Sequence, residues 1–223
     1  MHNEINISIS STELSSYTRG QISHLFPDRC EVEETVFEEL QTDALLKLSR
    51  CFSEIDNKYF RNGKKVFFNH LNGDQYSMFL YLMSFLANDI YKNQNLASKL
   101  YLLNKMLHGI DAFYEVMLPE IFLFVHPVGT VLGRANYGEF FTVYQGCGVG
   151  SNNGVSPTIG SNVTLHPNSF VLGNSQIGND CAIATGALVL DSSVDDNTTY
   201  IGRPGAHRIV QRRHRSGFFF NRN

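Results

Sequence analysis

The sequence predicts an α+β protein in which a helical N-terminal region precedes a parallel β-helix. The main observation is that an aliphatic residue recurs at every sixth position between residues 159 and 190. This period is neither the 3.6 of a helix nor the 2 of a strand, and hexapeptide repeats are typical of parallel β-helices. We expect the aliphatic side chains to point into the coil, and the small residues four positions later to lie near its corners. The aliphatic set is Ile159, Leu165, Val171, Ile177, Ile183 and Val189, and the small set is Val163, Ser169, Ser175, Cys181, Ala187 and Ser193.

The first 110 residues show helical spacing instead. A polar start over residues 1–30 contains one possible short helix, and apolar residues at helical spacing predict helices over residues 31–55, 75–92 and 95–108. Asn-Gly pairs between residues 57 and 73 indicate turns, and Gly109 is suited to end the last helix. We therefore predict a helical domain over 1–110, a β-helix over 111–205 and a basic tail over 206–223.

The hexads are irregular at both ends of the β-helix. An imperfect set starts at Leu132, Tyr137, Val143 and Val149, and residues 151–158 then interrupt the repeat. The repeat is expected to end where Asp195 falls on an inward position, and to reappear at Ile201. An excursion from a solenoid is a usual place for function, so the interruption is a candidate site.

Composition excludes several classes of protein. A net charge of −3 gives no field that would attract nucleic acid. Cys30, Cys51, Cys147 and Cys181 are scattered, which favours free thiols in a reducing cytoplasm over a disulfide framework. The apolar runs are too short to span a bilayer and the N-terminus does not look like a signal peptide, so we expect a cytoplasmic protein without a transmembrane segment.

Three segments carry a family resemblance. His126-Pro-Val-Gly-Thr-Val-Leu-Gly133 resembles a His-[Ala/Gly]-Thr-Gly-Val-Val-Ile-Gly motif, and both Tyr144-Gln145 and the segment from Thr198 to Pro204 have counterparts in the same family. Over roughly residues 75–212 the chain resembles the serine acetyltransferase family of hexapeptide acyltransferases. The resemblance implies a left-handed coil, assembly as a homotrimer or as a hexamer of two paired trimers, acetyl-CoA as the acyl donor and no metal.

His126 has the chemistry of a general base. A neutral imidazole can take the proton of a hydroxyl as its oxygen attacks a thioester, and a carboxylate on the second ring nitrogen would orient it. The family has an aspartate fifteen residues before its histidine, and Asp111 has that spacing from His126. The structural alternative is that Asp111 caps the start of the β-helix and His126 is an ordinary loop residue.

The sequence departs from the serine-specific pattern of the family. Val125 replaces an acidic residue, and Val155-Ser156-Pro157 replaces an Arg-His-Pro whose arginine holds the serine carboxylate. A site without that arginine should bind a zwitterion poorly, which favours a sugar hydroxyl as acceptor, with L-serine as the alternative. The candidate acceptor-binding residues, each of which could equally be a solvated loop residue, are His70, Tyr144, Gln145, Asn153 and Ser156.

Acetyl-CoA would need a groove lined by small residues, and positive charge for its phosphates. A backbone N–H near Gly150 is the candidate donor to the oxyanion, and Gly150 is a candidate for binding acetyl-CoA. The remaining candidates for binding acetyl-CoA are Ala182, Ala184, Thr185, Ala187, Arg203 and Arg208. In the tail, we expect Arg212 to Arg222 to be solvated, and we assign no role to Phe218-Phe219-Phe220.

Two other classes of function stay open. His126, His166 and His207 would be the candidate ligands of a zinc hydratase, although their spacing does not favour a metal site. A non-catalytic trimeric scaffold would bind neither metal nor acetyl-CoA. Within the enzyme class, Cys147 raises the alternative of a covalent acyl-enzyme, but no nearby residue in the sequence would lower the pKa of its thiol.

Overall fold

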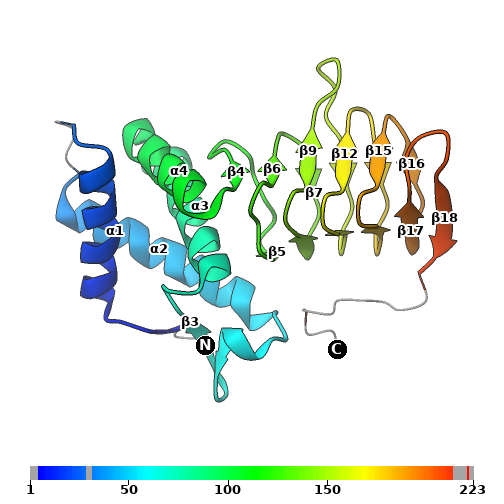
Figure 1. Cartoon of the computed structure of the whole chain (residues 1–223). Coiled ribbons are helices and arrows are strands. Elements are labelled where there is room, and N and C mark those ends of the chain that lie inside the picture. Colours follow the sequence, from blue (N-terminus) through cyan, green and yellow to red (C-terminus); the bar gives the residue numbers. More distant parts are fainter. Residues whose placement is uncertain (1–4, 29–31, 213–219, 221–223) are drawn as a thin grey trace. The chain divides into compact units, whose positions relative to one another are not determined.

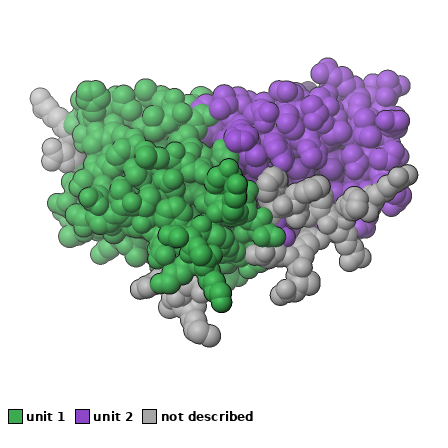
Figure 2. All heavy atoms as spheres, turned by 60° about the horizontal axis from the view of Figure 1, so that its bottom comes forward, with its two compact units in different colours: residues 1–108, 113–115 green, residues 109–112, 116–223 purple. Residues whose placement is uncertain are grey.

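The computed structural model describes residues 5–28, 32–212 and 220 of the chain. It divides into two compact units, one of residues 1–108 and 113–115 and the other of residues 109–112 and 116–223 (Figures 1 and 2). Among the described residues, no helix is long and apolar enough to cross a membrane. Cys51, Cys147 and Cys181 are buried and none of them is in a disulfide, and Cys30 lies outside the described residues.

The first unit is built on four helices: α1 (Ser11–Leu25), α2 (Glu34–Ser53), α3 (Gly73–Asp89) and α4 (Gln94–His108). α3 packs against both α2 and α4. The apolar positions that predicted the helices form the core, since Leu40, Leu48, Phe79 and Leu100 are completely buried. Gly109 follows α4 with a φ of +64°, the left-handed conformation that glycine adopts most readily after a helix.

α1 is longer than the short helix expected from the sequence. Its first turn is fixed by a capping box, in which the Ser10 hydroxyl accepts from the Glu13 N–H at 3.2 Å and the Glu13 carboxylate accepts from the Ser10 N–H at 2.8 Å. Polar residues interrupt the helical spacing of apolar residues in this helix, which is why its length was underestimated. The Ser-x-x-Glu spacing was the signal that would have given its start.

The predicted turn region between α2 and α3 contains a small sheet. The 3-10 helix η1 (Lys58–Phe60) leads into β2 (Arg61–Asn62), which forms a hairpin with β3 (Lys65–Phe68), and β1 (Asn6–Ile7) pairs with β3 in parallel. Asn62 of the first Asn-Gly pair ends β2 and pairs with Lys65, and Gly63, with a φ of +62°, begins the two-residue hairpin turn. The second pair starts α3, where the Asn72 side chain accepts from the N–H groups of Asp74 and Gln75.

The second unit is a parallel β-helix with three sheets (Figure 1). The β4 sheet contains β4 (Asp111–Ala112), β6 (Val131–Leu132), β9 (Gly148–Gly150), β12 (Phe170–Leu172) and β15 (Leu188–Leu190). The β5 sheet contains β5 (Phe122–Phe124), β8 (Phe141–Val143), β11 (Thr164–Leu165), β14 (Ala182–Ile183), β17 (Thr198–Ile201) and the antiparallel β18 (Arg208–Gln211). The β7 sheet contains β7 (Asn136–Tyr137), β10 (Thr158–Ile159), β13 (Gln176–Ile177) and β16 (Ser193–Val194).

The hexads predict the interior of this coil correctly up to residue 189. All six aliphatic residues from Ile159 to Val189 are at most 4% exposed, and the small residues from Val163 to Ala187 are completely buried. Each strand pairs with the equivalent strand one coil later, so that Leu165, for example, lies between Val143 and Ile183. The predicted fold class is therefore confirmed.

The end of the repeat was predicted wrongly. Ser193 and Asp195 are exposed, whereas Val194 and Tyr200 point inward and are 2% and 1% exposed. The connection between β15 and β16 has only two residues (191–192), one fewer than that between β12 and β13 (173–175), so the inward positions move back by one residue. The repeat continues through this point, and Ile201 lies beside the inward position.

Two of the connections between strands are longer than the equivalent connections in the other coils. We call the passage from the β5 sheet to the β4 sheet edge A, and that from the β4 sheet to the β7 sheet edge B. Edge A has six residues in its first copy (125–130) and four in each later copy (144–147, 166–169 and 184–187). Edge B has seven residues in its second copy (151–157), where the other copies have two or three. The other connections of edges A and B differ in length by at most one residue.

The last coil is closed by β18, which pairs with β17, and the His207 ring stacks on that of Tyr200 with centroids 4.8 Å apart. Phe220 is 5% exposed, and its ring centroid lies 5.4 Å from that of Phe140. Phe218, Phe219 and three of the tail arginines, Arg213, Arg215 and Arg222, lie outside the described residues.

A column of glycines gives a test of this stacking. A Cβ added to Gly160 would lie 2.7 Å from the backbone carbon of Gly178, and one added to Gly138 would lie 2.5 Å from that of Gly160. Because backbone atoms of the next coil cannot move aside, Gly160→Ala should destabilise the β-helix by about 1–3 kcal/mol. Urea unfolding monitored by circular dichroism measures the change.

The matched control is Gly150→Ala in the same unit, because its Cβ would meet only the end of the Leu172 side chain at 3.7 Å. It should unfold close to the wild-type midpoint. Equal midpoints for Gly160→Ala and the wild type would contradict the packing described for this column.

Candidate active site

His126 lies on the long first copy of edge A. It follows β5, is exposed, and has a φ of +49°, which is uncommon for a residue other than glycine. Phe124 pairs with Val143 and Val131 with Gly148, so six residues of this coil span the distance that four residues span in the next. The two extra residues carry the imidazole away from the regular wall of the coil, where a small molecule can reach it.

Asp111 reaches the same edge from β4. Its N–H donates to the Thr130 carbonyl at 2.8 Å, and the Gly129 N–H donates to the Gly109 carbonyl at 2.9 Å. The two predicted catalytic residues therefore belong to one hydrogen-bonded corner, although they are fifteen positions apart in the sequence. An interaction between their side chains stays a prediction.

Thr130 holds this corner to the next coil. Its side chain is buried, donates to the Tyr144 carbonyl at 2.7 Å and accepts from the Cys147 N–H at 3.2 Å. These two bonds fix the end of the segment that carries His126. A threonine in a loop gave no sequence signal for such a role.

Tyr144 and Gln145 stand on the next copy of edge A, one coil after His126. The Tyr144 ring stacks on that of His166 with centroids 5.6 Å apart and 20° between the planes, and burial raises the pKa of the Tyr144 hydroxyl. The Gln145 side-chain oxygen is buried, and no donor among the described residues reaches it. A buried acceptor without a donor is destabilising, so a ligand or a second copy of the chain that supplied an N–H or O–H would be favoured here.

The predicted acceptor-binding residues of the excursion lie at the other end of β9. Asn152 and Val155 form an antiparallel bridge, and Asn153 and Gly154 between them have φ values of 50° and 82°. The excursion is thus a two-residue hairpin with the Asn-Gly turn that such hairpins favour. Within one chain, the three-residue strand β9 separates Asn153 and Ser156 from Tyr144 and Gln145 by about 10 Å.

One further residue of edge B was missed by the sequence analysis. Arg134 is exposed in the first copy of edge B, directly before the coil that carries the hairpin, and the Gly133 N–H donates to the Val149 carbonyl at 2.8 Å. Among the described carboxylates, none forms an ion pair with Arg134. The signal in the sequence was an arginine directly after Gly133, the last residue of the segment that resembles the family motif.

The candidate residues for acetyl-CoA are spread over several coils. Ala184 and Thr185 lie on edge A, and Gly150 ends β9 near the hairpin. Ala187 is completely buried and faces into the coil, so its side chain does not line an outer groove, and Ala182 is 4% exposed. Arg203 and Arg208 are exposed on the last coil.

His70 belongs to the helical unit. It lies between β3 and α3, its Nδ1 is 2.7 Å from the Ser8 hydroxyl, and its ring meets that of Tyr17 edge-on. Among the described residues, no three His, Cys, Asp or Glu side chains are grouped so that they could hold a metal ion. The sequence alternative with His126, His166 and His207 as ligands therefore gains no support.

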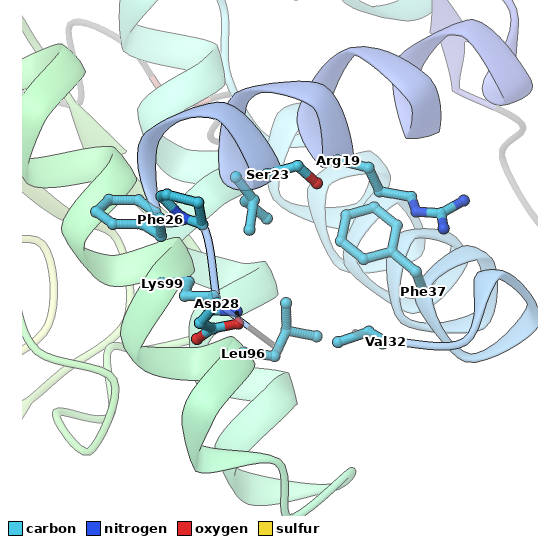
Figure 3. Close-up of a pocket in the computed structure, with 10 residues that line it drawn as sticks. Arg19, Ser23, Phe26, Asp28, Val32, Phe37, Leu96 and Lys99 are labelled. Atoms are coloured by element: carbon cyan, nitrogen blue, oxygen red, sulfur yellow. Dashed lines mark hydrogen bonds and ion pairs between the residues drawn. The ribbon is translucent and has the colours of Figure 1, made fainter. Parts of the chain in front are cut away.

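The helical unit also contains a pocket of about 360 Å³ between α1, α2 and α4 (Figure 3). Its walls combine apolar side chains with polar and charged ones, and the Lys99 ammonium pairs with the Asp28 carboxylate at 2.6 Å. Arg19 on its wall pairs with Glu34 at 2.9 Å. None of the predicted site residues lines this pocket.

The chain matches a family model, sequence relatives and solved structures. The bacterial transferase hexapeptide family (six repeats) matches residues 156–191. A serine acetyltransferase of Synechococcus elongatus is 33% identical over 115 residues, which are 49% of this chain and 46% of that protein. One of Staphylococcus epidermidis is 32% identical over 143 residues, which are 61% of this chain and 66% of that protein. The chain thus matches between about half and two thirds of the length of these relatives.

Solved structures share the fold at lower identity. The serine acetyltransferase of Neisseria gonorrhoeae is 21% identical, with a TM-score of 0.66 over 92% of this chain and 80% of that one. A serine acetyltransferase in complex with CoA is 14% identical, with a TM-score of 0.62 over 90% of this chain and 84% of that one.

His166 offers a test of the stacked edge. Burial, and to a lesser extent the positive charge of Arg212, lower the pKa of its imidazole from 6.5. NMR titration should therefore find a pKa below 6.5, and Arg212→Gln should raise it. Since the unfolded chain takes up this proton at higher pH, the associated stability is present above pH 6.5 and is lost as the pH falls towards the folded pKa. A wild-type pKa at or above 6.5 would contradict the burial described.

Proposed function

Because the chain belongs to the hexapeptide-repeat family that includes the serine acetyltransferases, we propose that it transfers an acetyl group from acetyl-CoA to an acceptor hydroxyl. The observation that carries the proposal is the exposed His126 on the long corner of the coil, in a chain whose sequence relatives are serine acetyltransferases. A solvent-accessible imidazole beside a carboxylate-bearing strand is suited to general-base catalysis.

In the proposed mechanism, His126 removes the proton of the acceptor hydroxyl as its oxygen attacks the thioester carbonyl. Asp111, from the same corner, orients the imidazole and stabilises its protonated form. The tetrahedral intermediate collapses to the acetyl ester, and the CoA thiolate leaves and takes up a proton. Cys147 does not fit a covalent intermediate, because its thiol is 1% exposed and contacts the His166 carbonyl at 3.1 Å.

A complete site would draw on two copies of the chain. His126 stands on edge A, whereas Gly150, Asn153 and Ser156 stand near edge B, at the opposite end of the β4-sheet strands. A neighbouring copy can bring its own edge B to edge A in a cyclic oligomer. The outer face of the β4 sheet supports such packing, because it is apolar and partly exposed at Val131, Phe170, Leu172, Leu188 and Leu190. We propose the trimer implied by the resemblance, with these residues at its interfaces.

L-serine is the first candidate acceptor, because both sequence relatives described above are serine acetyltransferases. This preference reverses the sugar acceptor favoured by the sequence analysis. That argument rested on the missing arginine of the excursion, and Arg134 offers a guanidinium one coil earlier on the same edge. We propose that Arg134 binds the carboxylate of serine.

A sugar acceptor remains the second candidate. The observation that favours it is the excursion itself, since residues 151–157 contain no charged side chain and expose amides and hydroxyls. Such groups suit a neutral polyol.

The base assignment predicts a large loss of turnover for His126→Asn. Removal of a general base should lower kcat by about two to four orders of magnitude, with little change in stability because the side chain is exposed. Thiol release from acetyl-CoA measures turnover. His24→Asn, at an exposed histidine of α1, is the matched control and should retain wild-type activity. A loss of less than tenfold for His126→Asn would contradict the assignment.

The acceptor assignment predicts turnover with L-serine and a specific role for Arg134. Arg134→Gln should raise the KM for serine by about tenfold, the usual size of a charge-assisted hydrogen bond, while leaving the KM for acetyl-CoA within about twofold. L-serine methyl ester, which lacks the carboxylate charge, should be insensitive to the substitution. Turnover with sugars or nucleotide sugars and none with serine would make the second candidate the function.

A further inference from the structure

The hairpin of the excursion is held by few contacts. Asn152 and Val155 exchange two backbone hydrogen bonds of 2.9 and 3.0 Å, which close the Asn153-Gly154 turn on itself. Asn153, Gly154 and Val155 are exposed. These bonds shape the hairpin internally but do not fix its direction relative to the coil.

A carboxylate from two coils later fixes that direction. Asp191 follows β15 on edge B, and its Oδ2 accepts from the Asn152 side-chain amide at 2.9 Å. Its other oxygen, Oδ1, accepts from the backbone N–H of Asn174 at 2.8 Å. Among the residues the structure describes, the bond between Asn152 and Asp191 is the one side-chain hydrogen bond made by residues 151–157.

Gly173 makes this contact possible. It belongs to the coil between those of Asn152 and Asp191 and has a φ of +68°. A Cβ on Gly173 would overlap the Asp191 carboxylate and would lie 2.9 Å from the Asn152 Cβ. The absence of a side chain leaves the space through which Asp191 reaches past one coil to the hairpin.

We propose that Asp191 is a positioning residue that holds the hairpin, and with it Asn153 and Ser156, in the orientation that binds the acceptor. The inference rests on the proposed function, in which the excursion contacts the acceptor. Without the contact to Asp191, the hairpin loses its one side-chain anchor and samples other orientations. Acceptor binding must then order it, which weakens acceptor affinity and leaves acetyl-CoA affinity unchanged.

The contact can be broken and rebuilt by exchanging its two groups. Asn152→Asp places two carboxylates against each other and should raise the acceptor KM by about tenfold, the size of a lost charge-assisted hydrogen bond. Asp191→Asn should have a smaller effect, because a rotated Asn152 amide can still accept a neutral hydrogen bond. In the double variant N152D/D191N, the amide of residue 191 donates to the carboxylate of residue 152, so the acceptor KM should return to within about twofold of wild type.

Gln176→Glu on β13 is the matched control, since it adds the same charge at an exposed amide outside the hairpin contact. It should leave both KM values unchanged. A merely structural role for Asp191 would move stability and kcat, but would not raise the acceptor KM alone. An unchanged acceptor KM for Asn152→Asp, or a double variant as impaired as Asn152→Asp, would overturn the proposal.

Hydrogen exchange at the Asn152 and Val155 amides gives a readout that does not need activity. Exchange should be faster in Asn152→Asp and return to the wild-type rate in the double variant. If the wild-type protein acetylates no acceptor, the proposed function fails. Whether Asp191 holds the hairpin is then tested by hydrogen exchange alone, and equal exchange rates in all variants would overturn that role.

Discussion

The stacking of one coil on the next constrains everything else in the β-helix. Every strand after the first coil is hydrogen-bonded to its equivalent in the neighbouring coil, and the inward side chains form continuous columns such as Val143, Leu165 and Ile183. An extra residue within a strand would turn every following side chain to the opposite face. Extra residues are therefore tolerated only at the edges, between strands. Both long connections of the coil, the six residues before β6 and the seven after β9, occur there.

The same constraint separates the two proposed functional elements within one chain. His126 is fixed to edge A by β5 and Thr130, and the hairpin is fixed to edge B by β9 and Asp191, so a strand of the β4 sheet always lies between them. A catalytic site that uses both elements cannot form by bending the coil. In the proposed function a second copy supplies the missing element, and the apolar outer face of the same sheet offers a surface on which it could pack.

The sequence predicts the coil well because the same inward aliphatic position recurs in each hexad and stacks on its equivalent in the neighbouring coil. It predicts α2, α3 and α4 to within three residues, since their apolar faces are long and periodic. It fails where one residue decides the outcome, as at Ser192, where a connection shortened by one moves Val194 inward in place of Asp195. In the site, the spacing to Asp111 anticipated a shared corner with His126. The contacts of Thr130 and Asp191 run across coils, and no local sequence pattern contains them.

The position of the arginine side chain bears on whether the proposed site can bind an amino-acid acceptor. A guanidinium on a long loop must be ordered when it binds a carboxylate, whereas Arg134 stands on a three-residue edge whose neighbours are tied into the ladder by Gly133 and Val149. A cation held by the coil loses less conformational freedom on binding. In the proposed enzyme, the hairpin then needs only neutral groups, and its short turn and its contact with Asp191 suffice to present them. Loss of the loop arginine is therefore compatible with an amino-acid acceptor, provided that the charge is supplied from the wall of the coil.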